Sequence, residues 1–145
     1  MSEQEQYFLD SSFLVALLDF KDVHHPRAVE MNTLMKRQKG ELFISDIVLN
    51  ETLSVIARKY EGEARHEELK RKFQAFFHHI EAKPILCLYE LVNQSFGFIQ
   101  KMILHTNGKL GFHDCLIVFF LRQVPLVHLV TFDEDFRQVK GISVL

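Results

Sequence analysis

Four carboxylates stand where this sequence is otherwise apolar, and two of them follow predicted strands. Asp10 comes directly after an apolar run at residues 7–9, and Asp133 follows the run at residues 126–130 with two residues between. In open parallel sheets, ligands collect outside the carboxyl ends of the strands. We therefore expect Asp10 and Asp133 to lie at one edge of a sheet, where they could bind a ligand together.

The other two acids, Glu51 and Asp114, lie on apolar helix faces. The neighbours at helical spacing are Ile47, Val48 and Val55 for Glu51, and Leu110, Ile117, Val118 and Leu121 for Asp114. This spacing turns each carboxylate toward the core. Because Asp and Glu are rarely buried without a partner, both positions suggest a ligand.

A divalent cation is the partner that these acids predict. No Lys or Arg lies near Asp114 on its stripe, and the Glu51 face has none until Arg58. Four carboxylates brought together without a cation would repel one another, and some would stay protonated. Oxygen-only ligation suits Mg²⁺ or Mn²⁺, and Mg²⁺ usually takes one or two carboxylates directly and keeps several waters. The remaining acids would then hold and activate those waters.

Each acid also has an interpretation that needs no metal. Asp10 could simply cap the following helix, and Glu51 could complement a helix dipole. Asp133 could be a turn residue in TFDEDF, whereas Asp114 would be a first-turn acid facing apolar residues instead of solvent. The agreement of all four favours the metal site.

Predicted strands and helices alternate along the chain. The strands are expected near residues 5–9, 41–44, 84–88, 126–130 and 142–145, and the helices near 11–20, 24–38, 46–60, 64–80, 89–105 and 112–123. This order predicts an α/β fold, a parallel sheet with right-handed crossovers and helices on both faces.

The totals fit one soluble domain covering residues 1–145. The net charge of −2 gives no global attraction to nucleic acid or membrane, and no apolar stretch approaches the ~20 residues needed to span a bilayer. The first residues, MSEQEQ, do not resemble a secretory signal. Cys87 and Cys115 lie in apolar runs, so we expect two reduced core cysteines and a cytoplasmic protein.

Five segments in order carry a resemblance to a known family. They are LDSSFLVALLD with Asp10, HHPRA at 24–28, ISDIVLNETLSV with Glu51, GFHDCLIVFFLR with Asp114 and LVTFDEDFRQVKGISVL with Asp133. The sequence resembles PIN-domain ribonucleases, particularly the VapC-type toxins of bacterial and archaeal toxin–antitoxin pairs.

The resemblance implies a three-layer α/β/α sandwich with about five parallel strands and an acidic pocket for Mg²⁺ or Mn²⁺. Asp10 and Asp114 would be the closest metal ligands, and Glu51 and Asp133 would complete the pocket. Thr131 matches the family's hydroxyl residue beside the last acid, and Ser11 or Ser12 could orient Asp10. Asp135 could take the place of Asp133 as the fourth acid. We prefer Asp133 because Asp133 is nearer the end of the strand.

The expected function is hydrolysis of RNA phosphodiester bonds by a toxin that an antitoxin protein silences. The alternatives are a PIN-like RNA- or protein-binding module with little or no nuclease activity, and an RNA-processing nuclease outside toxin–antitoxin systems. A haloacid-dehalogenase-like phosphohydrolase would need a second Asp where Ser12 stands. Zinc is disfavoured because no HExxH or CxxC motif occurs.

Two further surfaces are predicted around the fourth helix. Lys59, Arg65, Lys70, Arg71 and Lys72 could follow an RNA backbone, although interleaved Glu residues favour a solvated face. Phe73, Phe76, Phe77 and Ile80 recur at helical spacing. An exposed part of that stripe could bind a second copy, giving a homodimer, or an antitoxin helix.

Overall fold

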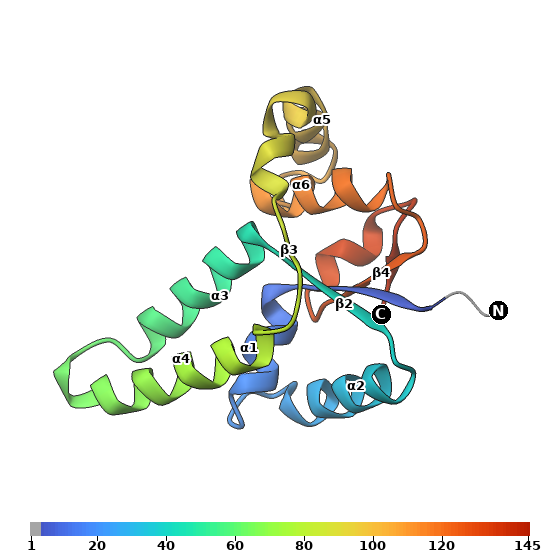
Figure 1. Cartoon of the computed structure of the whole chain (residues 1–145). Helices are drawn as coiled ribbons and strands as arrows, with labels where there is room; N and C mark the ends of the chain where they lie inside the picture. Colours follow the sequence, from blue (N-terminus) through green and yellow to red (C-terminus); the bar gives the residue numbers. More distant parts are fainter. Residues whose placement is uncertain (1–3) are drawn as a thin grey trace.

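The computed structural model describes residues 4–145, which form a central parallel sheet with helices on both faces (Figure 1). Residues 1–3, which begin the segment in which we predict no secretory signal, lie outside the described residues. Among residues 4–145, no helix combines the length and the apolar character needed to cross a membrane.

The sheet has five strands in the order β3-β2-β1-β4-β5, and all neighbouring strands are parallel. The strands are β1 (Gln6–Leu9), β2 (Glu41–Ser45), β3 (Ile85–Leu86), β4 (Val127–Val130) and β5 (Ser143–Val144). The chain builds outward from β1 through β2 to β3, then returns to place β4 on the other side of β1. The strand order therefore reverses between β1 and β4, where a parallel sheet opens a crevice at its carboxyl ends.

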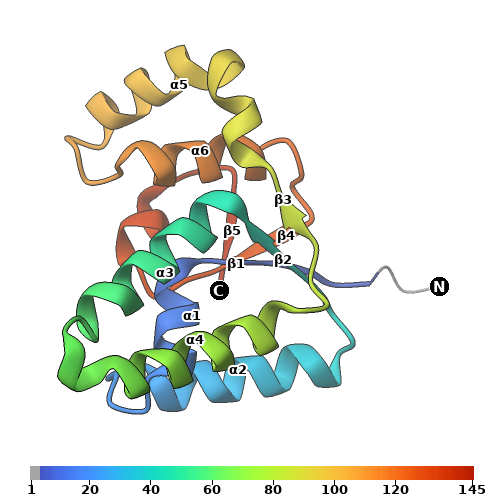
Figure 2. The same ribbon diagram turned by 60° about the vertical axis from the view of Figure 1, so that its left-hand side comes forward.

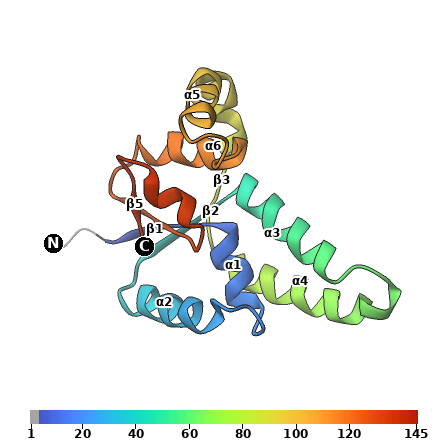
Figure 3. The same cartoon turned by 180° about the vertical axis from the view of Figure 1, so that it is seen from behind.

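Residues 4–145 also form six α-helices, which pack on the sheet or extend from it (Figure 1). They are α1 (Ser11–Leu18), α2 (His25–Arg37), α3 (Asp46–Lys59), α4 (His66–Ile80), α5 (Val92–His105) and α6 (Phe112–Leu121). Helices α5 and α6 lie on one face, and α1 and α2 lie on the other (Figure 2). Helices α3 and α4 run as a pair that projects away from the sheet (Figure 3). The predicted three-layer α/β/α fold is confirmed.

Burial along β1 explains its central place. Tyr7, Phe8 and Leu9 are all buried, although their side chains alternate between the two faces. A strand that is buried on both faces has the continuous apolar run typical of parallel sheets. The run ends at Asp10, whose backbone N–H still donates to the carbonyl of Val130 at 3.0 Å.

The main difference from the predicted elements lies between α3 and α5. The predicted helix from residue 89 begins at Val92, after a 3₁₀ turn at Leu88–Leu91. The Asp46 carboxylate accepts the backbone N–H groups of Leu88 and Tyr89 at 2.9 and 3.2 Å. These two N–H groups therefore bind a side chain instead of helical carbonyls, and the α-helix begins later. Ser45 caps α3, because its side-chain oxygen accepts a hydrogen bond from the Val48 N–H.

The prediction for the cysteines is half wrong. Both cysteines are free, and Cys115 is buried in α6, but Cys87 is exposed. Cys87 follows β3, a two-residue strand at the edge of the sheet that residues 4–145 form.

Candidate active site

Asp10 is buried at the carboxyl end of β1, with only 4% of its surface exposed. Its Oδ2 accepts hydrogen bonds from Ser12 Oγ at 2.9 Å and Thr131 Oγ1 at 2.7 Å. It occupies the N-cap position of α1, but its side chain makes no capping hydrogen bond. Burial raises the Asp10 pKa, hydrogen bonds from Thr131 and Ser12 lower it, and the nearby Glu51 charge raises it. The hydroxyls of Ser12 and Thr131 therefore hold the carboxylate, which does not cap the helix.

Ser12 and Thr131 join α1 to the loop after β4. Their hydroxyl oxygens are 3.0 Å apart, and each also accepts a backbone N–H, from Phe132 and Asp133 respectively, at 3.0 Å. The same two hydroxyls thus hold the Asp10 carboxylate and fix the backbone that leads to Asp133. Of the two serines predicted to orient Asp10, Ser12 has this contact.

Asp114 enters the same region from the first turn of α6. Its Oδ2 accepts the backbone N–H of Gly111 at 2.8 Å. Burial raises the pKa of Asp114 to about 6, with the charges of Asp10, Glu51 and Asp133 acting in the same direction, while the Gly111 hydrogen bond lowers it. The carboxylates of Asp10, Glu51 and Asp133, from three distant segments, therefore lie close enough for their charges to act on Asp114. We call this group, Asp10, Glu51, Asp114 and Asp133, the acidic edge.

Glu51 reaches the acidic edge from α3, where it is partly exposed. Ser11 Oγ donates to its Oε2 at 3.1 Å, and His113 Nδ1 lies 3.5 Å from its Oε1. Glu51 stands in the second turn of α3, beyond the first turn where a helix dipole acts strongly. Contacts with α1 and α6, more than the dipole, thus account for its position.

Asp133 combines a turn role with a place at the edge. Its Oδ1 accepts the backbone N–H of Asp135 at 2.9 Å, which begins a 3₁₀ turn at Glu134–Gln138. Its charge is also among those that raise the pKa of Asp114. This geometry favours Asp133 over Asp135 as the fourth acid, which remains a prediction.

The acids have the donor chemistry of a hard-cation site without forming a closed cage. Within residues 4–145, no three Asp, Glu, His or Cys side chains are placed to coordinate one ion. Oxygens of Asp114 and Asp133 instead accept backbone N–H groups, and Glu51 is held by Ser11 and His113. The donors are all carboxylate oxygens, and their mutual repulsion is what a dication would remove. The residues therefore fit Mg²⁺ or Mn²⁺ chemically.

Tyr89 is a site residue that the sequence did not predict. Its hydroxyl lies 3.1 Å from Nε2 of His113, whose other nitrogen faces Glu51. His113 is itself partly buried beside Glu51. Tyr89 and His113 are 24 residues apart, and no local pattern links them. Only the fold brings the two rings together.

The family follows from a comparison with known proteins. A model of the PIN domain family matches residues 7–142, nearly the whole chain. The chain belongs to the PIN-domain family. No curated protein sequence matches it.

Solved structures share the fold of this PIN domain at low sequence identity. VapC20 from Mycobacterium tuberculosis, described as a toxin that cleaves the sarcin–ricin loop, is 20% identical with a TM-score of 0.69, covering 96% of this chain and 98% of that one. A DNA-bound VapBC from Salmonella typhimurium is 17% identical with a TM-score of 0.67, covering 98% of each chain. VapBC2 from Rickettsia felis, bound to promoter DNA, is 16% identical with a TM-score of 0.63, covering 96% of each.

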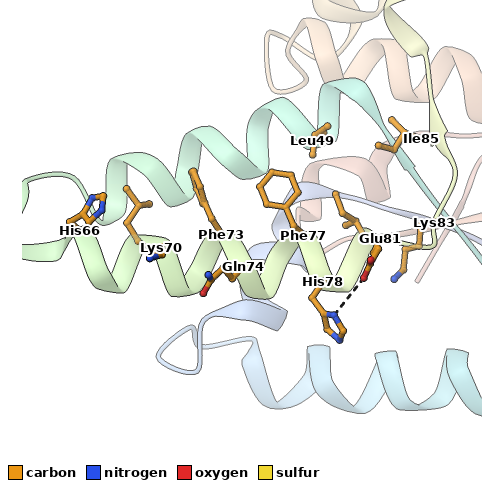
Figure 4. Close-up of a pocket in the computed structure, with 12 residues that line it drawn as sticks. Leu49, His66, Lys70, Phe73, Gln74, Phe77, His78, Glu81, Lys83 and Ile85 are labelled. Carbon is orange, nitrogen blue, oxygen red and sulfur yellow. Dashed lines mark ion pairs between the residues drawn. The ribbon is translucent and has the colours of Figure 1, made fainter.

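A second region of this PIN domain is an apolar groove along α4. The groove has a volume of about 930 Å³ and runs between α3, α4 and β3. Phe73 and Phe77 point from α4 toward α3, with Leu49 and Ile85 on the opposite wall (Figure 4). The predicted stripe is therefore divided: Phe76 and Ile80 are buried in the core, whereas Phe77 is 49% exposed.

The basic segment beside this groove is largely engaged within the domain. Lys59 forms an ion pair with the buried Asp19, and Arg65 donates to the carbonyl of Lys59. Lys72 donates to the carbonyl of Leu18 and lies over the rings of Phe20 and Tyr60. Lys59 and Lys72 thus join the helix pair to the end of α1, and Arg65 binds the end of α3, which weakens the idea that these cations form an RNA track.

Proposed function

We propose that this PIN domain is a divalent-metal-dependent endoribonuclease and the toxin of a toxin–antitoxin pair. The observation that carries the proposal is the convergence of Asp10, Glu51, Asp114 and Asp133 at the point where the strand order reverses. Membership of the PIN family and the shared fold with VapC proteins support it. We place the activity in the cytoplasm, where RNA is present and free cysteines stay reduced.

Asp10 and Asp114 are the residues that would hold the cation most directly, with Glu51 and Asp133 completing the site. A bound Mg²⁺ or Mn²⁺ would polarise a phosphodiester oxygen and lower the pKa of the attacking water. Ser12 and Thr131 hold the Asp10 carboxylate in place, so its orientation does not depend on the substrate. A preorganised carboxylate needs little rearrangement when the reaction begins.

Glu51 or Asp133 can accept the proton that the attacking water loses. Water adds to phosphorus while the bond from phosphorus to the 3′ oxygen breaks, and that oxygen takes up a proton. The products are a 5′-phosphate and a 3′-hydroxyl. Attack by the 2′-hydroxyl of RNA would instead leave a cyclic phosphate, so the ends distinguish the two routes.

Cleavage assays test this function directly. The substrates are total bacterial RNA and a hairpin with the sarcin–ricin loop, each incubated with Mg²⁺, Mn²⁺ or EDTA. We expect the wild type to leave 5′-phosphate ends with a metal and none with EDTA, and Asp114→Asn to be inactive. Asp135→Asn is the matched control and should keep its activity. Equal cleavage by the wild type and Asp114→Asn, or cleavage in EDTA, would contradict the proposal.

We propose that an antitoxin helix occupies the apolar groove. Two of the structures that share this fold are VapBC complexes, and an exposed apolar wall is what an amphipathic helix binds. The side chain of Phe77 in this wall is 49% exposed, so it is not part of the core and is accessible to a partner. An antitoxin bound there would contact α3, the helix that carries Glu51.

The test uses the product of a small neighbouring gene of antitoxin type. We expect it to inhibit cleavage by the wild type and to fail against Phe77→Asp, while both proteins cleave RNA equally without it. Phe96→Asp, at a similarly exposed phenylalanine on α5, is the control. Inhibition of Phe77→Asp as strong as that of the wild type would place the partner elsewhere. If the wild type forms a dimer without the antitoxin and Phe77→Asp is a monomer, the groove binds a second copy of this chain.

A further inference from the structure

A small polar cavity lies beside the acidic edge on the side of α3. It has a volume of about 280 Å³. Its walls are Ser11, Asn50, Glu51, Ser54, Val55, Arg58 and His113. Glu51 belongs to both places, whereas Asp10, Asp114 and Asp133 do not line the cavity. The cavity therefore begins where the acidic edge ends.

Arg58 is the cation of this cavity, and its side chain is only partly engaged. Its Nε donates to the Ser54 carbonyl at 3.3 Å, and no Asp or Glu within residues 4–145 forms an ion pair with it. Its neighbour Lys59 differs, because it is paired with the buried Asp19. The terminal nitrogens of Arg58 are thus available to a ligand.

The position of Arg58 relative to Glu51 suits a chain of phosphates. The two residues stand seven apart on one face of α3, which at 1.5 Å per residue separates their backbones by about 10 Å along the helix. The planar guanidinium binds phosphate through two parallel N–H groups, and the side chains of Asn50 and Ser54 add donors on the same wall. The Glu51 carboxylate would repel a free anion that entered the cavity. In a nucleic-acid strand, however, the phosphate is tied to its neighbour at the acidic edge.

We propose that Arg58 binds a phosphate of the RNA substrate that flanks the cleaved phosphate. This inference rests on the proposed ribonuclease function and adds the path of the strand, from the acidic edge over Glu51 and along α3. It also explains how a chain with net charge −2 can hold a polyanion, since the cation lies locally where the strand must pass.

Binding of a labelled pool of single-stranded RNA 20-mers tests the inference. Every protein carries Asp114→Asn, so that no RNA is cleaved during the titration. We expect Arg58→Gln to weaken binding roughly tenfold and to reduce the salt slope by about one, as loss of a single phosphate contact does. Arg71→Gln, at an exposed arginine of α4 outside the cavity, should change binding less than about twofold.

The outcomes separate this inference from the proposed function. Equal binding by the Arg58→Gln and Arg71→Gln proteins, with a wild type that still cleaves RNA, would overturn the role of Arg58 alone. A wild type that neither binds nor cleaves RNA would overturn both proposals. A titration with inorganic phosphate tests a free-anion site. If Arg58→Gln lost phosphate binding but kept RNA binding, the ligand would be a free anion and the inference would be wrong.

Discussion

The acidic edge and the apolar groove differ in how their side chains are held. At the acidic edge, every carboxylate accepts a hydrogen bond from the protein, and Asp10 is fixed by two hydroxyls. In the groove, Phe77 is half exposed and is held mainly by packing against Phe73 and Phe76. The first region is held by hydrogen bonds within the domain, whereas the second exposes apolar area that a partner could bury.

The two regions meet on one helix. Leu49 of α3 lines the groove, and Glu51, two residues later, belongs to the acidic edge. Residues two apart on a helix point to different sides. A partner in the groove therefore contacts the helix that carries Glu51 without touching the carboxylate. Separate substitutions should therefore abolish RNA cleavage or partner binding. Because both regions include residues of α3, partner binding should still influence cleavage.

The largest expected effect is on cleavage at the acidic edge. Asp10→Asn keeps the side-chain shape but removes the charge, and we expect the rate of RNA cleavage to fall by about 10²- to 10⁴-fold. Because burial, with the nearby charge of Glu51, raises the pKa of Asp10 and so disfavours its ionised form, the melting temperature should not fall. Paired cleavage and thermal-denaturation measurements check this. A large loss of stability would mean that the four acids are structural.

Neighbouring phenylalanines of α4 sharpen the contrast in stability. Phe76 is fully buried, so Phe76→Ala should lower the free energy of unfolding by about 3–5 kcal/mol. Phe77 is 49% exposed, and Phe77→Ala should cost less than about 1 kcal/mol. Urea denaturation of both variants gives the two values. Similar losses would show that the groove belongs to the core.

Removal of a hydroxyl beside Asp10 should give a smaller loss of activity. Thr131→Val deletes the 2.7 Å hydrogen bond to Asp10, and supporting contacts of this kind are worth about 10- to 100-fold in activity or metal affinity. Thr33→Val, on the exposed side of α2, is the matched control. Unchanged Mn²⁺ affinity and activity in Thr131→Val would contradict the positioning role.

The smallest expected effect concerns pH and His79, in the last turn of α4. Burial, with Lys83 and Lys36 nearby, lowers the pKa of His79 to about 4. Unfolded His79 takes up its proton near pH 6.5, so the unfolded state binds more protons between pH 6.5 and 4. This contribution to stability is therefore complete above pH 6.5 and falls as the pH drops, by about 2 kcal/mol at pH 5.

Urea denaturation at pH 7 and pH 5 measures this difference. His79→Gln should flatten the pH dependence, whereas His78→Gln should leave it unchanged, since the His78 side chain is 88% exposed. If the wild type and both variants show the same pH dependence of stability, protonation of His79 does not cause it.

The fold was predictable because its patterns are local. The apolar run that ends at Asp10 and the helical stripes around Glu51 and Asp114 arise from neighbours in the sequence. The contact between Tyr89 and His113 depends on how the 3₁₀ turn at Leu88–Leu91 packs against α6, and no periodicity encodes it. No periodicity predicts the hydrogen bonds that the N–H groups of Leu88 and Tyr89 donate to the Asp46 carboxylate. These bonds make the helix begin later than predicted.

The anomalous signal from a crystal grown with Mn²⁺ shows directly whether the acidic edge binds a divalent cation. We predict one or two manganese peaks in the crevice between β1 and β4, with oxygens of Asp10 and Asp114 as ligands and no such peak in Asp10→Asn. Manganese bound only elsewhere, or bound equally after Asp10→Asn, would contradict a metal site at the acidic edge.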